Sequence, residues 1–229
     1  MPVSKIEVAR LITSVLDIDR RSEAMNSYLV EKVSAKLTGV LPDDIVRPSP
    51  LITIPLLAAL SAALSEPVLC DLYSTLLATA MDKNTARDVQ PGFVSIIQQL
   101  ASDEAKILIH LTKERRLESP VINLISTQPD HSGEQFKLRH FSLLGNDAGC
   151  QFAEYIPVYL ENLCRLGLAQ IESGSLSDNT QYDRILDFPF IIELRQEIQK
   201  EGRLPKVSKH IFSLTNMGML FSNVCIIQS

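Results

Sequence analysis

Apolar residues recur every three or four positions through most of the first 110 residues, the spacing of one face of an α-helix. The segment 66–82 shows this best, because its apolar residues at 68, 69, 72, 73, 76, 77, 80 and 81 form a wide stripe. The pattern predicts a helix there and further helices over 1–21, 22–39, 54–65, 90–101 and 102–116.

Prolines interrupt this helical region between residues 41 and 50. Each proline pushes the residue before it out of helical geometry, so we expect a rigid extended connection there. Pro55 suits a first helical turn, and we therefore expect the next helix to start near it.

The pattern changes after residue 117, where β-branched residues and alternation replace the helical stripe. Strands are predicted over 120–127, 135–144, 168–172 and 205–214, and helices over 150–167, 183–202 and 215–225. Gly167 is a candidate left-handed helix cap, and Pro189 is expected to bend its helix.

These elements predict a mainly α protein with a smaller α+β part. We expect an N-terminal helical region, residues 1–100, packed on a winged-helix-like α+β region, residues 101–229. The boundary is open between about residues 90 and 117, and the chain could also form one compact unit.

Composition excludes a disordered chain, because 45% of the 229 residues are hydrophobic and 21% are charged. The net charge of −5 is spread evenly, which disfavours non-specific nucleic-acid binding. The widely spaced Cys70, Cys150, Cys164 and Cys225 indicate reduced thiols in a cytoplasmic protein. One uncharged run, 48–65, is broken by proline and shorter than the about 20 residues of a spanning helix, so no membrane span is expected.

The segment 69–111 resembles the signature stretch of the abortive infection alpha family of bacterial proteins. In that family a leucine-rich helix ends at alanine-methionine-aspartate, and a proline turn and two further helices follow. Segments 46–60, 161–171 and 212–225 are similar to other parts of the family, so the likeness covers about 26–229. The matching positions in the signature stretch are Leu72, Tyr73, Leu76, Leu77, Ala78, Ala80, Met81, Asp82, Val89, Pro91, Phe93, Ile97, Leu100, Asp103, Glu104, Ala105, Lys106 and Leu108.

The resemblance implies a setting in bacterial defence against phage, in which an infected cell stops growing or dies. It implies no catalytic site, because the shared motif describes packed helices and a proline turn. We accordingly expect a protein that acts by binding an unidentified protein partner or a second copy of itself. Its trigger and target do not follow from the sequence.

Catalytic and metal constellations are not apparent in the sequence. His110, His131, His140 and His210 have no metal-ligand spacing with one another or with the cysteines, and no glycine-rich phosphate loop is present. We therefore expect no enzyme activity, no cofactor and no metal.

A nucleic-acid-binding winged helix is the alternative. The helix over 150–167 would lie in the major groove and the last strand would form the wing. A candidate phosphate-binding patch consists of Arg115, Arg116, Arg165, Lys206, Lys209 and His210. The opposing interpretation is that these residues lie on separate solvated faces, and the two glutamates of the helix, Glu154 and Glu161, favour it.

Overall fold

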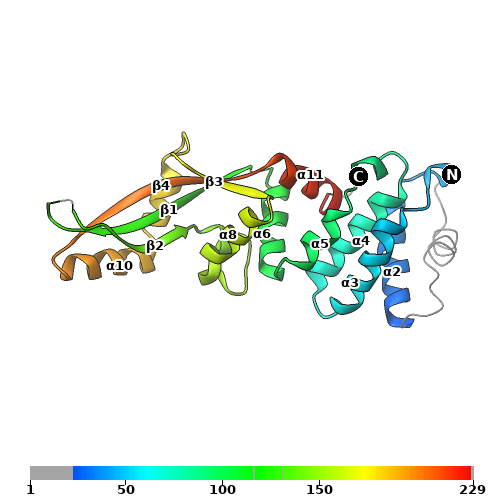
Figure 1. Cartoon of the computed structure of the whole chain (residues 1–229), viewed down its shortest axis with the longest axis horizontal. Helices are drawn as coiled ribbons and strands as arrows, with labels where there is room; N and C mark the ends of the chain where they lie inside the picture. Colours follow the sequence, from blue (N-terminus) through cyan, green and yellow to red (C-terminus); the bar gives the residue numbers. More distant parts are fainter. Residues whose placement is uncertain (1–22, 116, 131, 228–229) are drawn as a thin grey trace. The chain divides into compact units, whose positions relative to one another are not determined.

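The structure is a computed structural model that describes residues 23–115, 117–130 and 132–227. The described chain forms two compact units (Figure 1). The first contains the residues up to Ala105 and those from Met219 onward, and the second contains Lys106–Gly218. The boundary between the two units falls inside helix α6 (Ser102–Lys113), five residues beyond the expected boundary at residue 100. The C-terminal segment from Met219 belongs to the first unit, whereas it was expected in the second region.

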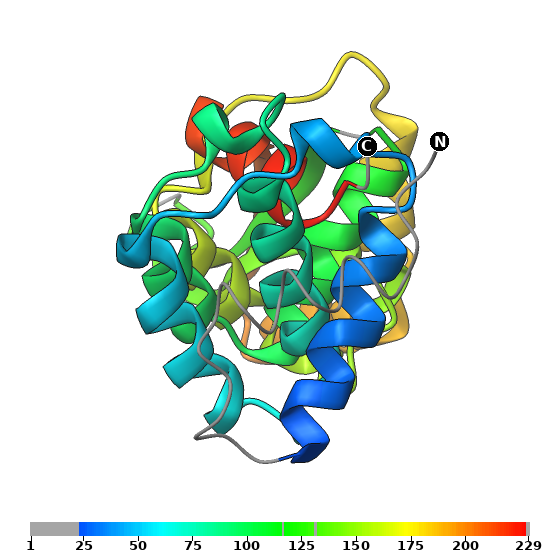
Figure 2. The same ribbon diagram turned by 90° about the vertical axis from the view of Figure 1, so that its right-hand side faces the viewer.

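The first unit is built around α4 (Pro67–Met81), which is buried along most of its length. The helices α2 (Glu23–Lys36), α3 (Pro50–Ala62) and α5 (Gly92–Gln98) contact it, and Figure 2 shows α4 between α2 and α3. The short 3-10 helices η2 (Pro42–Asp44) and η3 (Ala86–Asp88) lie in the connections. These helices confirm the predicted ones over 22–39, 66–82 and 90–101, whereas the predicted helix over 1–21 lies outside the described residues.

The end of α11 (Asn216–Cys225) completes this core. Phe221 meets Phe93 edge to face, with ring centroids 5.4 Å apart, and the Thr79 hydroxyl donates to the Val224 carbonyl at 2.9 Å. These contacts join residues more than 120 positions apart in the sequence. They explain why the C-terminal segment belongs to the first unit.

The start of α3 was predicted wrongly. The helix begins at Pro50 and carries Pro55 in its interior. Ser49 caps it, because its side chain accepts the Leu51 N–H at 3.3 Å, and Pro50 then occupies the first turn, where no N–H is needed. The capped first turn therefore precedes Pro55 and sets where the helix begins.

The second unit holds an antiparallel sheet with the strand order β2-β1-β4-β3, drawn in Figure 1. Its strands are β1 (Glu118–Thr127), β2 (Gln135–Phe141), β3 (Ala169–Ser173) and β4 (Leu204–Leu214), which confirms all the predicted strands. The helix α8 (Ile156–Arg165) contacts β2 and β3, whereas α9 (Thr180–Leu186) contacts β1 and α10 (Pro189–Lys200) contacts β4. The mainly α architecture with an α+β part is thus confirmed.

Two predicted helices of this unit are each divided. The segment 150–167 contains the 3-10 helix η4 (Ala153–Tyr155) before α8, and a short helix α7 (Leu144–Asp147) precedes it. The segment 183–202 is split into α9 and α10, because Pro189 starts a new helix instead of bending one. Gly167 ends α8 with a φ of 74°, as predicted for a left-handed cap. Within the described residues, no helix has the length and apolar character needed to cross a membrane.

Candidate functional site

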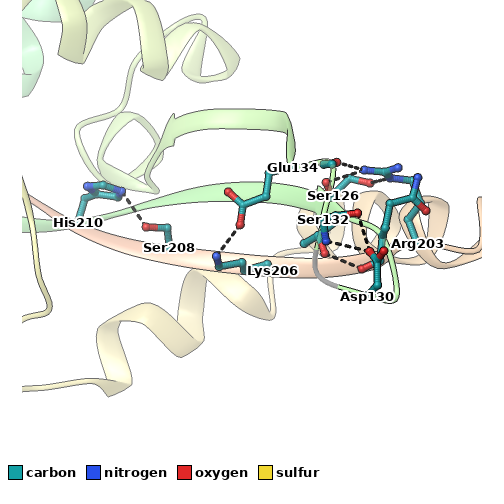
Figure 3. Close-up of polar contacts among 11 residues, drawn as sticks. Ser126, Asp130, Ser132, Glu134, Arg203, Lys206, Ser208 and His210 are labelled. Atoms are coloured by element: carbon teal, nitrogen blue, oxygen red, sulfur yellow. Dashed lines mark hydrogen bonds and ion pairs between the residues drawn. The ribbon is translucent and has the colours of Figure 1, made fainter.

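The structure places the strand residues of the candidate phosphate-binding patch on two faces of the sheet. Side chains alternate along a strand, so Lys206 and His210 of β4 point to one face and Lys209 to the other. Lys206 is paired with Glu134, with Nζ 2.7 Å from Oε1 (Figure 3). Lys209 lies over the Tyr182 ring of α9, 4.8 Å from its centroid, and donates to Asn179 Oδ1. The two lysines therefore cannot contact the same stretch of phosphates.

The arginines of the patch come from other elements of the second unit. Arg115 follows α6 with a φ of 51°, and it lines a hollow with His110, Glu114 and Asp147. Arg165 ends α8, and its Nε donates to Asn162 Oδ1 at 2.9 Å. Arg116 lies outside the described residues.

Arg203, at the start of β4, was not among the predicted site residues. It donates to the side chain and carbonyl of Ser126 and to the carbonyl of Gly133, which ties β4 to β1 and to the β1–β2 connection (Figure 3). Its guanidinium group donates to backbone and hydroxyl oxygens, and the side chain therefore stabilises the sheet.

A polar network lies on the His210 face of the sheet and joins three strands to α8. Asn123 of β1 has a side chain that accepts the backbone N–H of His140 at 2.8 Å and faces His210 Nε2 at 2.9 Å. Ser208 Oγ lies 3.1 Å from the same nitrogen (Figure 3). On the other side, His140 Nδ1 lies 3.0 Å from Glu161 of α8. We call Asn123, His140, Glu161, Ser208 and His210 the histidine network.

A bulge in β2 brings His140 into this network. The register between β1 and β2 shifts between Ile122 and Leu124, and His140 adopts a φ of 51° at this point. A left-handed conformation is uncommon for a residue other than glycine, and bulges redirect side chains. The hydrogen bond from the His140 N–H to Asn123 compensates part of the strain, because it gives the displaced backbone group an acceptor.

The network fixes the protonation of His210. Since Asn123 Oδ1 accepts a backbone N–H, its Nδ2 must donate to His210 Nε2, which is therefore unprotonated. Burial and the nearby His140, whose ring centroid is 6.4 Å away, lower the pKa of His210. Both observations indicate a neutral imidazole.

Chemically, this arrangement favours a structural connection over proton transfer. The lone pair of His210 Nε2 already receives the Asn123 amide, so it is poorly placed to take a proton from Ser208. Among the residues that the structure describes, no three His, Cys, Asp or Glu side chains are arranged to hold a metal ion. The histidine network thus links β2, β4 and α8 through the buried Asn123, which is 6% exposed.

The outward face of η4 and α8 is apolar and aromatic. Ile156, Leu160 and Leu163 turn inward and are buried, whereas Phe152, Tyr155 and Val158 are 48%, 54% and 59% exposed. The rings of Phe152 and Tyr155 lie 6.3 Å apart, and those of Tyr155 and Tyr159 lie 6.5 Å apart. We call Phe152, Tyr155, Val158 and Tyr159 the aromatic face. None of these four residues was among the predicted site residues.

The four cysteines are free thiols, and Cys70 and Cys225 are buried. Burial raises the pKa of Cys225 well above its usual range and that of Cys164 to about 11. A thiol with a raised pKa is a poor nucleophile at neutral pH. Cys164 and Cys225 therefore act as packing side chains.

Comparison with known proteins links the chain to one family. The sequence model described as Abortive infection alpha matches residues 9–225. No curated protein shows significant similarity to the chain. Among solved structures, the chain is similar to an uncharacterized protein from the hydrocarbon-degrading marine bacterium Alcanivorax borkumensis SK2. The two share 21% sequence identity with a TM-score of 0.40, over 58% of this chain and 90% of that protein.

Proposed function

The chain belongs to the Abortive infection alpha family, and from this premise we propose that it acts in a bacterial abortive response to phage by binding a protein partner. The proposal places it in the cytoplasm and assigns it binding without catalysis. The partner engages the aromatic face of η4 and α8. A second copy of the chain is one form that this partner can take.

The exposure of Phe152, Tyr155 and Val158 is the observation that supports this proposal. Aromatic side chains are enriched at protein interfaces and supply much of their binding energy, because they bury a large area at a small entropic cost. Val158 lies on α8, whose inner side is anchored by Ile156, Leu160 and Leu163, and Phe152 and Tyr155 lie directly before this helix. A preorganised surface of this kind loses little conformational freedom on binding.

Capture of the chain from phage-infected and uninfected cells tests the proposal. Wild-type protein is expected to retain an infection-dependent partner, and Val158→Asp to lose it, because a carboxylate would be buried without a counter-charge. Ile192→Asp is the matched control, since Ile192 is also an exposed apolar residue of the second unit but lies on α10. Equal capture by both variants would contradict the assignment of the aromatic face.

Nucleic-acid binding by a winged-helix-like second unit is the alternative. It is supported by the order of α8, β3 and β4, in which a helix precedes an antiparallel strand pair, and by Arg139, whose guanidinium stacks 3.5 Å above the ring of Phe136. Such a pair can stack on an unpaired base. The outward side of η4 and α8 favours a protein partner, because it presents Tyr155 and Val158 where a reading helix would present basic residues.

A further inference from the structure

An apolar cavity of about 330 Å³ lies in the second unit between β2, η4 and the start of α10. Its lining comes from β2, α7, η4 and the residues around Pro189. The lining residues are Leu138, Phe141, Asn146, Ala153, Glu154, Phe188 and Phe190. The cavity belongs neither to the histidine network nor to the outward-facing side chains of α8.

Three phenylalanine rings form the walls of this cavity. Phe141, at the end of β2, is only 6% exposed, and its ring centroid lies 6.1 Å from that of Phe188 and 5.9 Å from that of Phe190. The rings are tilted by 36° and 47° with respect to Phe141. They do not close into one stack, and this leaves aromatic faces and edges available to a planar ligand.

Only two of the residues that line the cavity have polar side chains. Glu154 is its one charged residue, and Asn146 supplies an amide. The described structure gives neither side chain a hydrogen bond or ion pair with another residue. An apolar pocket with a small number of polar groups is typical of small-molecule sites, in which those groups orient the ligand.

We propose that this cavity binds a small heteroaromatic molecule that carries a cationic amino group. The ring lies against Phe141, Phe188 and Phe190, and the amino group faces the Glu154 carboxylate. Three aromatic rings and one carboxylate attract a cation through the ring faces as well as through the charge, which disfavours anionic ligands. The volume is near the lower end of the about 300–1,000 Å³ range of ligand pockets, so it suits one ring system and a short side chain.

Two indole probes that differ in the sign of their charge test this proposal. Tryptamine carries an ammonium group, whereas indole-3-propionate carries a carboxylate on the same ring. The chain contains no tryptophan, so indole fluorescence anisotropy reports the probe without a protein background. Tryptamine is expected to bind the full chain with saturation. Indole-3-propionate is expected to bind at least about fivefold more weakly, because it loses the charge pair with Glu154, which is worth up to about fivefold, and brings a like charge to it instead.

Variants of the lining assign any binding to the cavity. Glu154→Gln keeps the side-chain shape and is expected to weaken tryptamine binding about fivefold, whereas Glu193→Gln on α10 is the matched control and should change nothing. Phe190→Ala removes a half-exposed ring and should weaken binding about tenfold. The proposal is overturned if tryptamine does not saturate, if both probes bind equally, or if Glu154→Gln binds like Glu193→Gln.

Discussion

Replacing Asn123 by aspartate is expected to reverse the titration behaviour of His210. One carboxylate oxygen can still accept the His140 N–H, but the other now faces His210 Nε2 where the wild type presents an N–H donor. An acceptor facing Nε2 requires a proton on that nitrogen. The pKa of His210, which burial and His140 lower in the wild type, should therefore rise above its ordinary value of about 6.5.

The opposite perturbation, Asn123→Ala, removes both contacts. It leaves the His140 N–H without its acceptor, which costs about 1–3 kcal/mol, and it loses a hydrogen bond to His210 worth about 1 kcal/mol. We expect a loss of about 2–4 kcal/mol in the free energy of unfolding. Ser208→Ala is the matched control on the same face, since its hydroxyl also touches His210 Nε2 but holds no displaced backbone group.

NMR titration of the histidine ring protons measures the pKa values, with His210→Gln to assign the signal. Wild-type His210 should titrate below about 6.5 and the Asn123→Asp protein above it. If the aspartate variant leaves the titration of His210 unchanged, the assigned orientation of the Asn123 amide is wrong. A loss under about 1 kcal/mol for Asn123→Ala in denaturant unfolding would likewise refute its role in holding the bulge.

Three further outcomes are expected. In the wild type, the pKa of His210 is lowered, so the unfolded chain binds more protons than the folded protein just below pH 6.5. The free energy of unfolding should therefore fall as the pH falls through this window, and calorimetry of His210→Gln should show a flatter pH profile there. Gly218→Ala should lower the free energy of unfolding by about 3 kcal/mol or more in thermal unfolding, because a Cβ there would overlap the Leu168 carbonyl oxygen. Gly92 has open space around it, so the control Gly92→Ala should be neutral or slightly stabilising. The double variant Lys206→Glu and Lys209→Glu should keep its melting temperature within a few degrees and show no salt-sensitive binding to duplex DNA; wild-type binding that the pair weakens more than about tenfold would favour the nucleic-acid alternative.

Most elements of the fold could be predicted because their signals are local. The apolar stripe of 66–82 and the β-branched run of 120–127 correspond to α4 and β1, and Gly167 ends its helix as expected. Prolines were the main source of error. Pro55 is accepted inside α3 because Ser49 and Pro50 start the helix earlier, and Pro189 opens α10 where a bend was expected.

The division into units and the candidate site depend on contacts between distant segments. Phe93 with Phe221 and Thr79 with Val224 place the C-terminal segment in the first unit, and no local pattern carries that information. The histidine network required a bulge that turns His140 toward Asn123, and strand alternation alone does not predict a bulge. Alternation does separate Lys206 from Lys209, so that feature of the basic residues was available in the sequence.

The central claim is that the chain acts in abortive infection through the aromatic face of η4 and α8. The most direct test compares phage-infected cultures that express the wild type, Val158→Asp or the control Ile192→Asp at equal abundance. The account predicts that the wild type and Ile192→Asp limit the release of phage progeny, and that Val158→Asp releases as many as cells without the protein. Protection by Val158→Asp equal to that of the wild type would contradict the account.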